Sequence, residues 1–260
     1  MTSKYLIWIT LLLSFFSSGA FSQSRVIEDS LVYSDPTLSK GGGWIYGGSV
    51  DYWQVNMRYP SDNSNVVGTL NYYQPGASLF IGKGDLTVLL SYKNGSGDLE
   101  YPFDTSKITT TQTQLSLRYL LSDLSTEYVT PYVMTSYWDY ELKSTQYFPK
   151  SPSTYYATEN TKSRAPMIGG GGIFPFSKSF GLRLDGLWGI TNSSGSHTRG
   201  NRMGNTGNIT MLTSTLYYNV TENVNFQFGY QLTTFKPSAN YNQTNRTVDG
   251  LYLKLGYTFK

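Results

Sequence analysis

The closing segment of the chain, residues 251–259, constrains the fold most, because its side chains alternate between apolar and polar or small at every position. In an extended strand, successive side chains point to opposite faces of the sheet. The apolar face carries Leu251, Leu253, Leu255, Tyr257 and Phe259, and the other face carries Gly250, Tyr252, Lys254, Gly256 and Thr258. Most of the chain before it repeats this pattern, which predicts an all-β protein whose sheet presents one continuous apolar face.

The composition favours a β-sheet protein in a membrane over a soluble enzyme. The 260 residues include 23 Tyr and 26 Gly, and only 14% are charged. A chain that is rich in Tyr and Gly and poor in charge is typical of β-barrels. The chain has no Cys, which excludes disulfides and thiolate metal sites, and we expect no cofactor and no metal. The formal charge of +3 is too small to indicate a nucleic-acid partner.

The N-terminus predicts a signal peptide over residues 1–22. Lys4 supplies a positive charge, residues 6–16 form an apolar core, and a small-x-small cleavage site precedes Gln23. The apolar core has about eleven residues, whereas a membrane-spanning helix needs about twenty. A cleaved leader is therefore favoured over a membrane anchor.

The rest of the chain divides into a polar segment, residues 23–43, and a strand-rich region, residues 44–260. The polar segment has no clear period and is predicted to form a periplasmic arm, with an inserted plug segment as the alternative. No other run is long and apolar enough to span a membrane as a helix. If the mature chain lies in a membrane, it must cross it with strands, and only a closed barrel satisfies the backbone of strands in lipid.

Residues 44–260 contain about ten extended segments joined alternately by short and long connections. An even number of antiparallel strands, with short turns on one side and long loops on the other, is typical of single-chain bacterial barrels. Eight strands would follow if the segment around Pro75 is irregular, and twelve if a long loop hides a hairpin. The long connections predicted to be extracellular are about 59–69, 94–108, 144–163, 193–207 and 236–247.

The alternation slips once, in the first of these segments. Its apolar face runs through Tyr52, after which Val55 and Met57 fall out of phase. A bulge near Tyr52 and Trp53 would explain the slip. The aromatic residues of the predicted outward faces are expected to form girdles at the membrane interfaces; they include Trp44, Tyr46, Trp138, Tyr140, Trp188 and Tyr257.

The closing segment, with Phe259 just before Lys260, resembles the final strand of bacterial outer-membrane β-barrels, which ends on a terminal or near-terminal aromatic. The whole mature chain resembles a class of small barrels that includes the OmpA transmembrane domain and OmpW-type proteins, and no single member of it. The resemblance implies a transmembrane antiparallel up-and-down β-barrel of about ten strands in the outer membrane of a Gram-negative bacterium. It also implies that the closing strand serves as an assembly signal for the barrel assembly machinery, and that lipid and lipopolysaccharide surround the barrel.

Projecting the alternation inward places charges of both signs in the lumen, namely Asp51, Lys93, Arg118, Asp139, Glu141, Lys143, Arg183, Asp185 and Lys254. A barrel of about ten strands is only slightly wider than one that side chains can fill. These side chains should therefore meet as hydrogen-bonded charge pairs, because unpaired buried charges are costly. The network either fills and stiffens the barrel or forms a gate, in which Arg118 and Arg183 exchange carboxylate partners and admit small solutes.

The single histidine, His197, is the one candidate for catalysis. The barrel hydrolases of the outer membrane resemble one another in needing a His beside a carboxylate, Ser or Asn near the outer rim. Here the preceding residues, 192–196, have a flexible loop composition that positions nothing, and the paired aspartates of omptins are absent. We therefore expect a non-enzymatic barrel that is a narrow channel or a structural or adhesive surface protein. The alternative is a rim hydrolase, a protease or a lipid A or phospholipid acyl hydrolase, that uses His197.

The predicted external loops are slightly basic. Positive side chains near the rim would suit the phosphates of lipopolysaccharide, and plain solubility explains them equally well. The residues concerned are Lys150, Lys162, Arg164, Arg199 and Arg202.

Overall fold

The computed structural model describes residues 43–60, 67–100, 105–148, 155–197, 202–237 and 246–259. The predicted signal peptide, residues 1–22, and all of the predicted arm except Gly43 lie outside these residues. Within them, no helix has the length and apolar character needed to cross a membrane.

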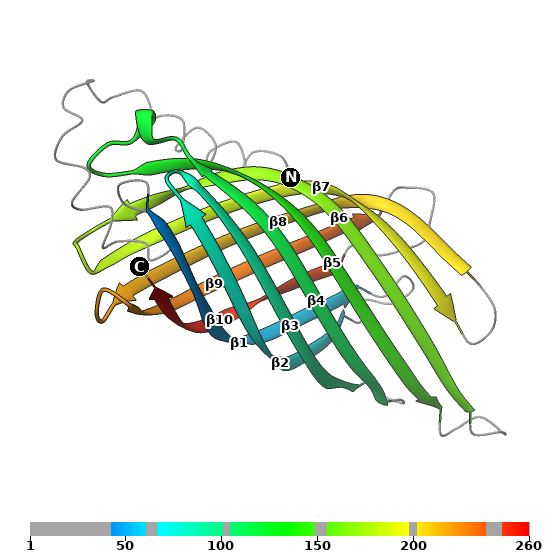
Figure 1. Cartoon of the computed structure of the whole chain (residues 1–260). Coiled ribbons are helices and arrows are strands. Elements are labelled where there is room, and N and C mark those ends of the chain that lie inside the picture. The colour runs from blue at the N-terminus through cyan, green and yellow to red at the C-terminus, as the bar shows by residue number, and fades with distance from the viewer. Residues whose placement is uncertain are drawn as a thin grey trace.

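The described residues form a closed antiparallel barrel of ten strands with one short 3-10 helix, η1 (Ser122–Leu124) (Figure 1). Each strand pairs with the next along the chain, and β10 pairs with β1 to close the barrel. The predicted up-and-down barrel of about ten strands is confirmed. The strands are β1 (Trp44–Pro60), β2 (Val67–Lys83), β3 (Leu86–Glu100), β4 (Thr105–Leu120), β5 (Thr130–Phe148), β6 (Tyr155–Pro175), β7 (Phe180–His197), β8 (Arg202–Asn219), β9 (Val224–Pro237) and β10 (Arg246–Phe259).

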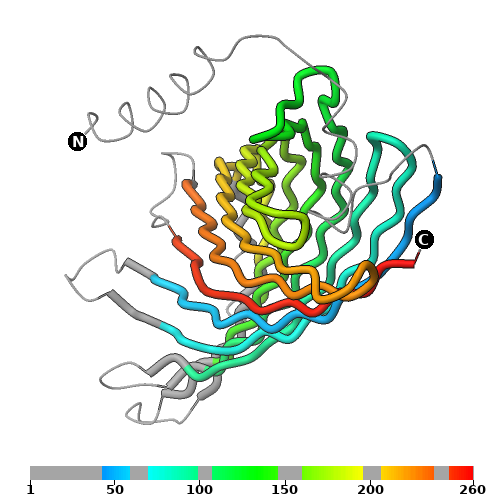
Figure 2. Tube along the Cα trace, turned by 90° about the vertical axis from the view of Figure 1, so that its left-hand side faces the viewer, coloured from blue at the N-terminus to red at the C-terminus, as the bar shows by residue number. Residues whose placement is uncertain are grey.

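The closure joins the two ends of the strand-rich region. Figure 2 shows β1, in blue, beside β10, in red, and their register runs from Tyr46 opposite Phe259 to Arg58 opposite Thr247. Closure leaves no sheet edge to expose unpaired backbone groups, which is the condition for a sheet to lie in lipid.

Pro75 is accommodated within a regular β2. The ladder between β1 and β2 is continuous past it, with Pro75 opposite Tyr52. On the other side, the ladder to β3 passes from the pair Tyr73–Ser96 directly to the pair Gly76–Lys93. Proline has no backbone N–H to donate, so the interruption falls where the donor is missing, and β2 keeps its place in the barrel.

The outward side chains form a lipid-facing belt with an aromatic upper edge. Along most strands the exposed positions in this belt are apolar, as in Val50, Leu79 and Leu90. The aromatic edge, on the side away from the short turns, consists of Tyr52, Tyr73, Tyr92, Tyr137, Trp188 and Tyr230, each 40–53% exposed. An apolar band bounded by aromatic side chains is what a strand barrel presents to a bilayer.

The strands continue well beyond this belt, so the long loops are shorter than predicted. For example, β5 and β6 remain paired as far as Phe148 opposite Tyr155, within the predicted loop 144–163. His197, also assigned to a loop, is the last residue of β7, where its backbone lies opposite Glu159. Beyond the lipid the outer face of the wall need not be apolar, so these strand ends lack the apolar outer face on which the sequence prediction depended.

Candidate functional site

The apolar face of β5 points into the lumen, opposite to the sequence prediction. Trp138 is 2% exposed, whereas its neighbour Tyr137 is 47% exposed. The ring centroid of Trp138 lies 5.3 Å from that of Phe235 on β9. Because β5 and β9 are not neighbours in the sheet, this contact crosses the lumen. Tyr140 is also buried, so neither Trp138 nor Tyr140 belongs to a membrane girdle.

The predicted bulge in β1 is also absent. The ladder to β2 pairs every residue of β1 without an extra one. Val55 and Met57 are in phase with Trp53 and Asp51, and all four side chains are buried inside the barrel. The apolar side chains change face at Tyr52 because the environment changes there: within lipid the outer face is dry, and above it the inner face is dry.

The lumen beyond the lipid belt is filled by an apolar cluster, which we call the upper lumen cluster. Tyr140 lies against Phe235 with ring centroids 6.1 Å apart, and the hydroxyl groups of Tyr72 and Thr110 are hydrogen-bonded at 2.9 Å. The cluster consists of Trp53, Val55, Met57, Leu70, Tyr72, Ile108, Trp138, Tyr140, Leu142, Ala165, Met167, Leu187, Ile209, Met211, Val248 and Tyr252, with Met134 and Phe235 packed against it.

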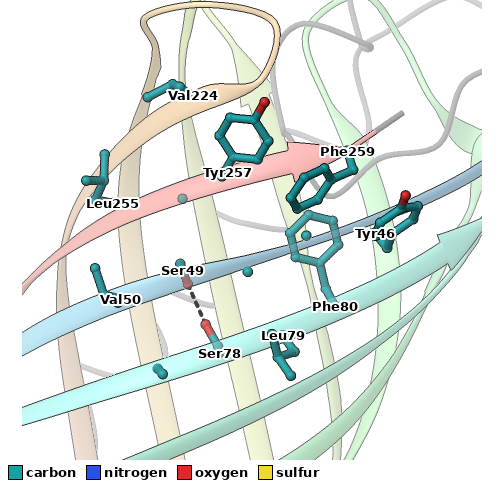
Figure 3. Close-up of a pocket in the computed structure, with 14 residues that line it drawn as sticks. Tyr46, Ser49, Val50, Ser78, Leu79, Phe80, Val224, Leu255, Tyr257 and Phe259 are labelled. Atoms are coloured by element: carbon teal, nitrogen blue, oxygen red, sulfur yellow. Dashed lines mark hydrogen bonds between the residues drawn. The ribbon is translucent and has the colours of Figure 1, made fainter.

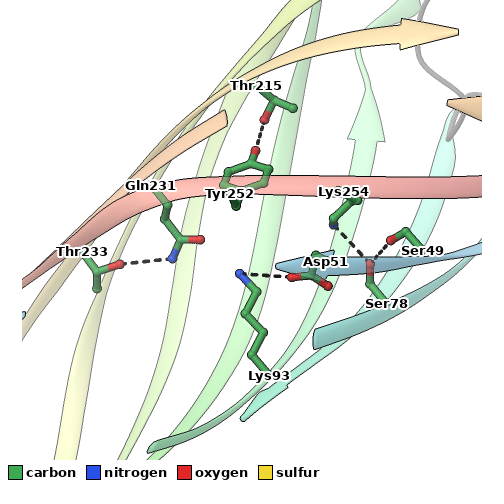
Figure 4. Close-up of polar contacts among 9 residues, drawn as sticks. All are labelled: Ser49, Asp51, Ser78, Lys93, Thr215, Gln231, Thr233, Tyr252 and Lys254. Carbon is green, nitrogen blue, oxygen red and sulfur yellow. Dashed lines mark hydrogen bonds and ion pairs between the residues drawn. The ribbon is translucent and has the colours of Figure 1, made fainter. Parts of the chain in front are cut away.

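The upper lumen cluster meets a polar layer at Asp51 and Lys93. Lys93 Nζ lies 3.7 Å from Asp51 Oδ2 and 4.6 Å from the ring centroid of Trp53, a cation–π contact. Lys254 Nζ, from β10, donates to Ser78 Oγ at 3.2 Å, and Figure 4 shows both groups within the barrel. The charges of three strands therefore meet inside the wall and not in lipid.

A second part of the polar layer is built around Tyr132. Its hydroxyl donates to Asp185 of β7, and the guanidinium of Arg118 lies 5.4 Å from its ring centroid. Arg183 Nε lies 3.4 Å from Asp185 Oδ2. The glycine-rich part of β6 makes room for this contact, since a Cβ on Gly171 would lie 2.6 Å from the hydroxyl oxygen of Tyr132.

Six of the nine charges predicted for the lumen lie in this polar layer, and three do not. Those inside are Asp51, Lys93, Arg118, Arg183, Asp185 and Lys254. Asp139, Glu141 and Lys143 lie on the outer face of β5, because the whole strand has the opposite phase to the one predicted. Sequence reasoning also missed the inward Tyr132 and Trp53, although the slip after Tyr52 was a signal of the change of face.

The displaced charges form an outer charged patch with β6, consisting of Asp139, Glu141, Lys143, Lys162 and Arg164. Arg164 Nε donates to Asp139 Oδ2 at 3.0 Å. Glu141 Oε1 lies 3.4 Å from Lys143 Nζ and 3.7 Å from Lys162 Nζ. The three cationic side chains are 52–61% exposed, and Asp139 is the next outward position after Tyr137 of the aromatic edge. The patch therefore lies just outside the lipid belt.

No known protein family matches this sequence, and no curated protein matches it. Solved structures do match its fold. The outer membrane protease OmpT of Escherichia coli aligns over 86% of this chain and 98% of its own, with a TM-score of 0.52 and 10% identity. The translocator domain of the autotransporter NalP of Neisseria meningitidis aligns over 89% and 93%, with a TM-score of 0.54 and 8% identity. The chain therefore has the fold of an outer-membrane β-barrel. At such low identity, the similarity concerns the fold alone.

The outer wall of the barrel has a groove where β1 meets β10, near the end with the short turns. The hollow, which we call the seam groove, has a volume of about 760 Å³ and lies over β1, β2 and β10. Figure 3 shows Tyr46, Val50, Leu79, Leu255, Tyr257 and Phe259 around it. All six side chains are exposed on the lipid-facing side.

Within its described residues, the barrel has no group of three or more His, Cys, Asp or Glu that could hold a metal ion. The charged groups Asp51, Lys93, Arg183, Asp185 and Lys254 of the lumen make the contacts given above.

Proposed function

We propose that the protein is a non-enzymatic outer-membrane barrel whose lumen is closed by its own side chains, and that it acts as a structural or adhesive protein at the cell surface. The observation that carries this proposal is the aromatic contact across the lumen, between Trp138 of β5 and Phe235 of β9. It supports a closed barrel over the alternative of a narrow channel.

Two consecutive layers obstruct the lumen. A solute entering from outside would have to displace close-packed side chains such as Trp138, Met57 and Ile209, each no more than 2% exposed. It would then have to separate Asp51 from Lys93 and Arg183 from Asp185. Protein interiors are close-packed and leave few voids, and breaking buried ion pairs is strongly unfavourable. The lumen charges thus support a filling and stiffening role.

The part of the wall above the lipid belt supports the proposed surface role. There the upper lumen cluster gives the strands a core of their own, and the strands of the hairpin β5–β6 stay paired as far as Phe148 and Tyr155. Rigid walls of this kind position loops for recognition. We propose that the connections between these strands make the contacts of the protein with its surroundings.

A planar-bilayer recording tests the closed lumen. We expect the purified wild-type barrel to show no conductance steps, and Arg183→Ala to lower thermal stability without opening a path. Heat-modifiable migration on gels serves as the control that the inserted protein is folded. Steps in the wild type, or steps that appear in Arg183→Ala, would contradict the proposal and favour a gate. In a parallel lipid-hydrolysis assay, activity that disappears in His197→Ala would favour the rim hydrolase.

We also propose that the outer charged patch binds phosphates of lipopolysaccharide in the outer leaflet. Lysine and arginine are the side chains that bind phosphate, and three of them project outward beside the aromatic edge. The patch has three cations and two carboxylates, and Lys107 on the neighbouring β4 is also exposed.

Replacing both Lys162 and Arg164 with Gln should weaken lipopolysaccharide binding about tenfold, as expected when a charge-assisted hydrogen bond worth about 1.5 kcal/mol is lost. The measurement is a titration of the detergent-solubilised barrel with lipopolysaccharide at two salt concentrations, since screening weakens exposed charges. The matched control is Lys178→Gln, an exposed lysine in the short turn at the other end. Equal affinity of the double variant and the control would disprove this partner.

A further inference from the structure

We infer that the seam groove is a binding site for one phospholipid of the periplasmic leaflet, with an acyl chain in the groove and its phosphate at Lys83. This site is independent of the closed lumen. It lies on the opposite face of the wall and at the end of the barrel with the short turns, which is expected to be periplasmic.

The groove exists because one outward position of β1 has no side chain. Gly48 has the same phase as Tyr46 and Val50, and it pairs with Tyr257 on β10 and with Leu79 on β2. All four neighbours are large and exposed. The next outward position of β2, Ala77, is exposed and also small. The missing side chains leave a depression with mostly apolar walls (Figure 3), and the two serines that also line it, Ser49 and Ser78, are hydrogen-bonded to each other at 2.6 Å.

The walls of the groove are held in place by aromatic packing. The rings of Tyr46 and Phe259 stack with centroids 5.2 Å apart, and Tyr257 meets Phe259 edge to face at 4.7 Å. A hollow with such fixed walls can hold an acyl chain without having to reorganise, which favours a resident chain over the exchanging lipid around it. Because the groove belongs to the lipid-facing belt, its natural occupant is a hydrocarbon chain.

A cation lies where the headgroup of that lipid would be. Lys83, exposed, pairs with Trp44 at the end of β2, and its Nζ lies 5.4 Å from the centroid of the Trp44 ring. Lys83 is four residues from Leu79, which corresponds to about 13 Å along a strand. A lipid with its phosphate on Lys83 would therefore extend its acyl chain past Tyr46 and over Gly48. The positive charge selects an anionic phospholipid over a neutral one.

Native mass spectrometry of the full-length mature barrel, in maltoside micelles containing phosphatidylglycerol, tests this site. We expect one lipid to remain bound per wild-type barrel. Gly48→Leu should weaken its binding about tenfold, because the leucine occupies the space of several methylene groups. A Cβ on Gly48 would lie 3.1 Å from Leu79 Cδ2, so Ala77→Leu serves as a second filling variant that does not depend on this contact.

The control is Gly186→Leu on the far wall, where an added Cβ would meet only Leu212 Cδ2, at 3.6 Å; this variant should keep wild-type affinity. Lys83→Gln should weaken the binding of phosphatidylglycerol and should not change the binding of diacylglycerol with the same acyl chains. Undiminished lipid binding in both filling variants would overturn the inference. So would barrel dimers that disappear in Gly48→Leu, because the groove would then be occupied by a second copy.

Discussion

Trp138→Ala is expected to lower the free energy of unfolding by about 3–5 kcal/mol, the range for removing a fully buried large aromatic side chain. The variant removes the ring that bridges the lumen to Phe235 and leaves a cavity in the upper lumen cluster. Tyr137→Ala, one residue away on the outer face, should cost clearly less, because Tyr137 is about half exposed. Denaturant titration of the barrel in lipid vesicles measures both changes.

Trp138→Phe separates packing from polarity at the same position. The indole N–H of Trp138 has no hydrogen-bond partner among the described residues, so phenylalanine should retain much of the ring packing at little polar cost. We therefore expect the loss to be largest in Trp138→Ala and much smaller in Trp138→Phe. A larger loss in Tyr137→Ala than in Trp138→Ala would mean that β5 has the phase first predicted from its sequence, with Trp138 in lipid.

Phe228→Arg should lower the free energy of unfolding by about 2–4 kcal/mol, because it places a charge near the middle of the hydrocarbon. Phe228 is 46% exposed and lies at the centre of the outward run of β9, which extends from Val224 to Leu232. Thr234→Arg, on the same face of the same strand and beyond that run, should cost only about 0–1 kcal/mol, as expected at the membrane interface.

The same unfolding titration measures both arginine variants, and urea-dependent tryptophan fluorescence in vesicles is a suitable readout. Similar costs at Phe228 and Thr234 would show that the lipid belt does not end between them. The placement of the outer charged patch beside the headgroups would then also be wrong, since it depends on the same upper edge.

The sequence alone determined the architecture, because strand alternation and turn parity are local properties of the chain. In β10 all five predicted outward side chains, Leu251 to Phe259 on alternate positions, are 43–59% exposed. The number and order of the strands followed from the short turns, such as the one at Gly84, whose φ of 58° suits glycine. Six inward charges were also placed correctly, since their strands carry an apolar outer face within lipid.

Tertiary structure alone decided which face of a strand is dry. Alternation shows that Trp138, Tyr140 and Leu142 share a face. It does not show which face, because an apolar side chain is stabilised both by lipid outside the barrel and by packed neighbours inside it. In β5 most of the apolar residues lie at and above the aromatic edge, where the inner face is the dry one. A one-residue change of phase moves every side chain of a strand to the other face. The wrong phase predicted for β5 therefore placed Asp139, Glu141 and Lys143 in the lumen.

The contacts that close the lumen were equally beyond local reasoning. Trp138 meets Phe235 only because the barrel is closed and β5 faces β9 across the lumen. Tyr132 reaches Asp185 across Gly171 of β6, because that position has no side chain. The seam groove depends on closure as well, since Gly48 is a hollow only between Tyr257 of β10 and Leu79 of β2. Local periodicity determined the wall of this protein, and the meeting of distant strands decided what lies inside it and against it.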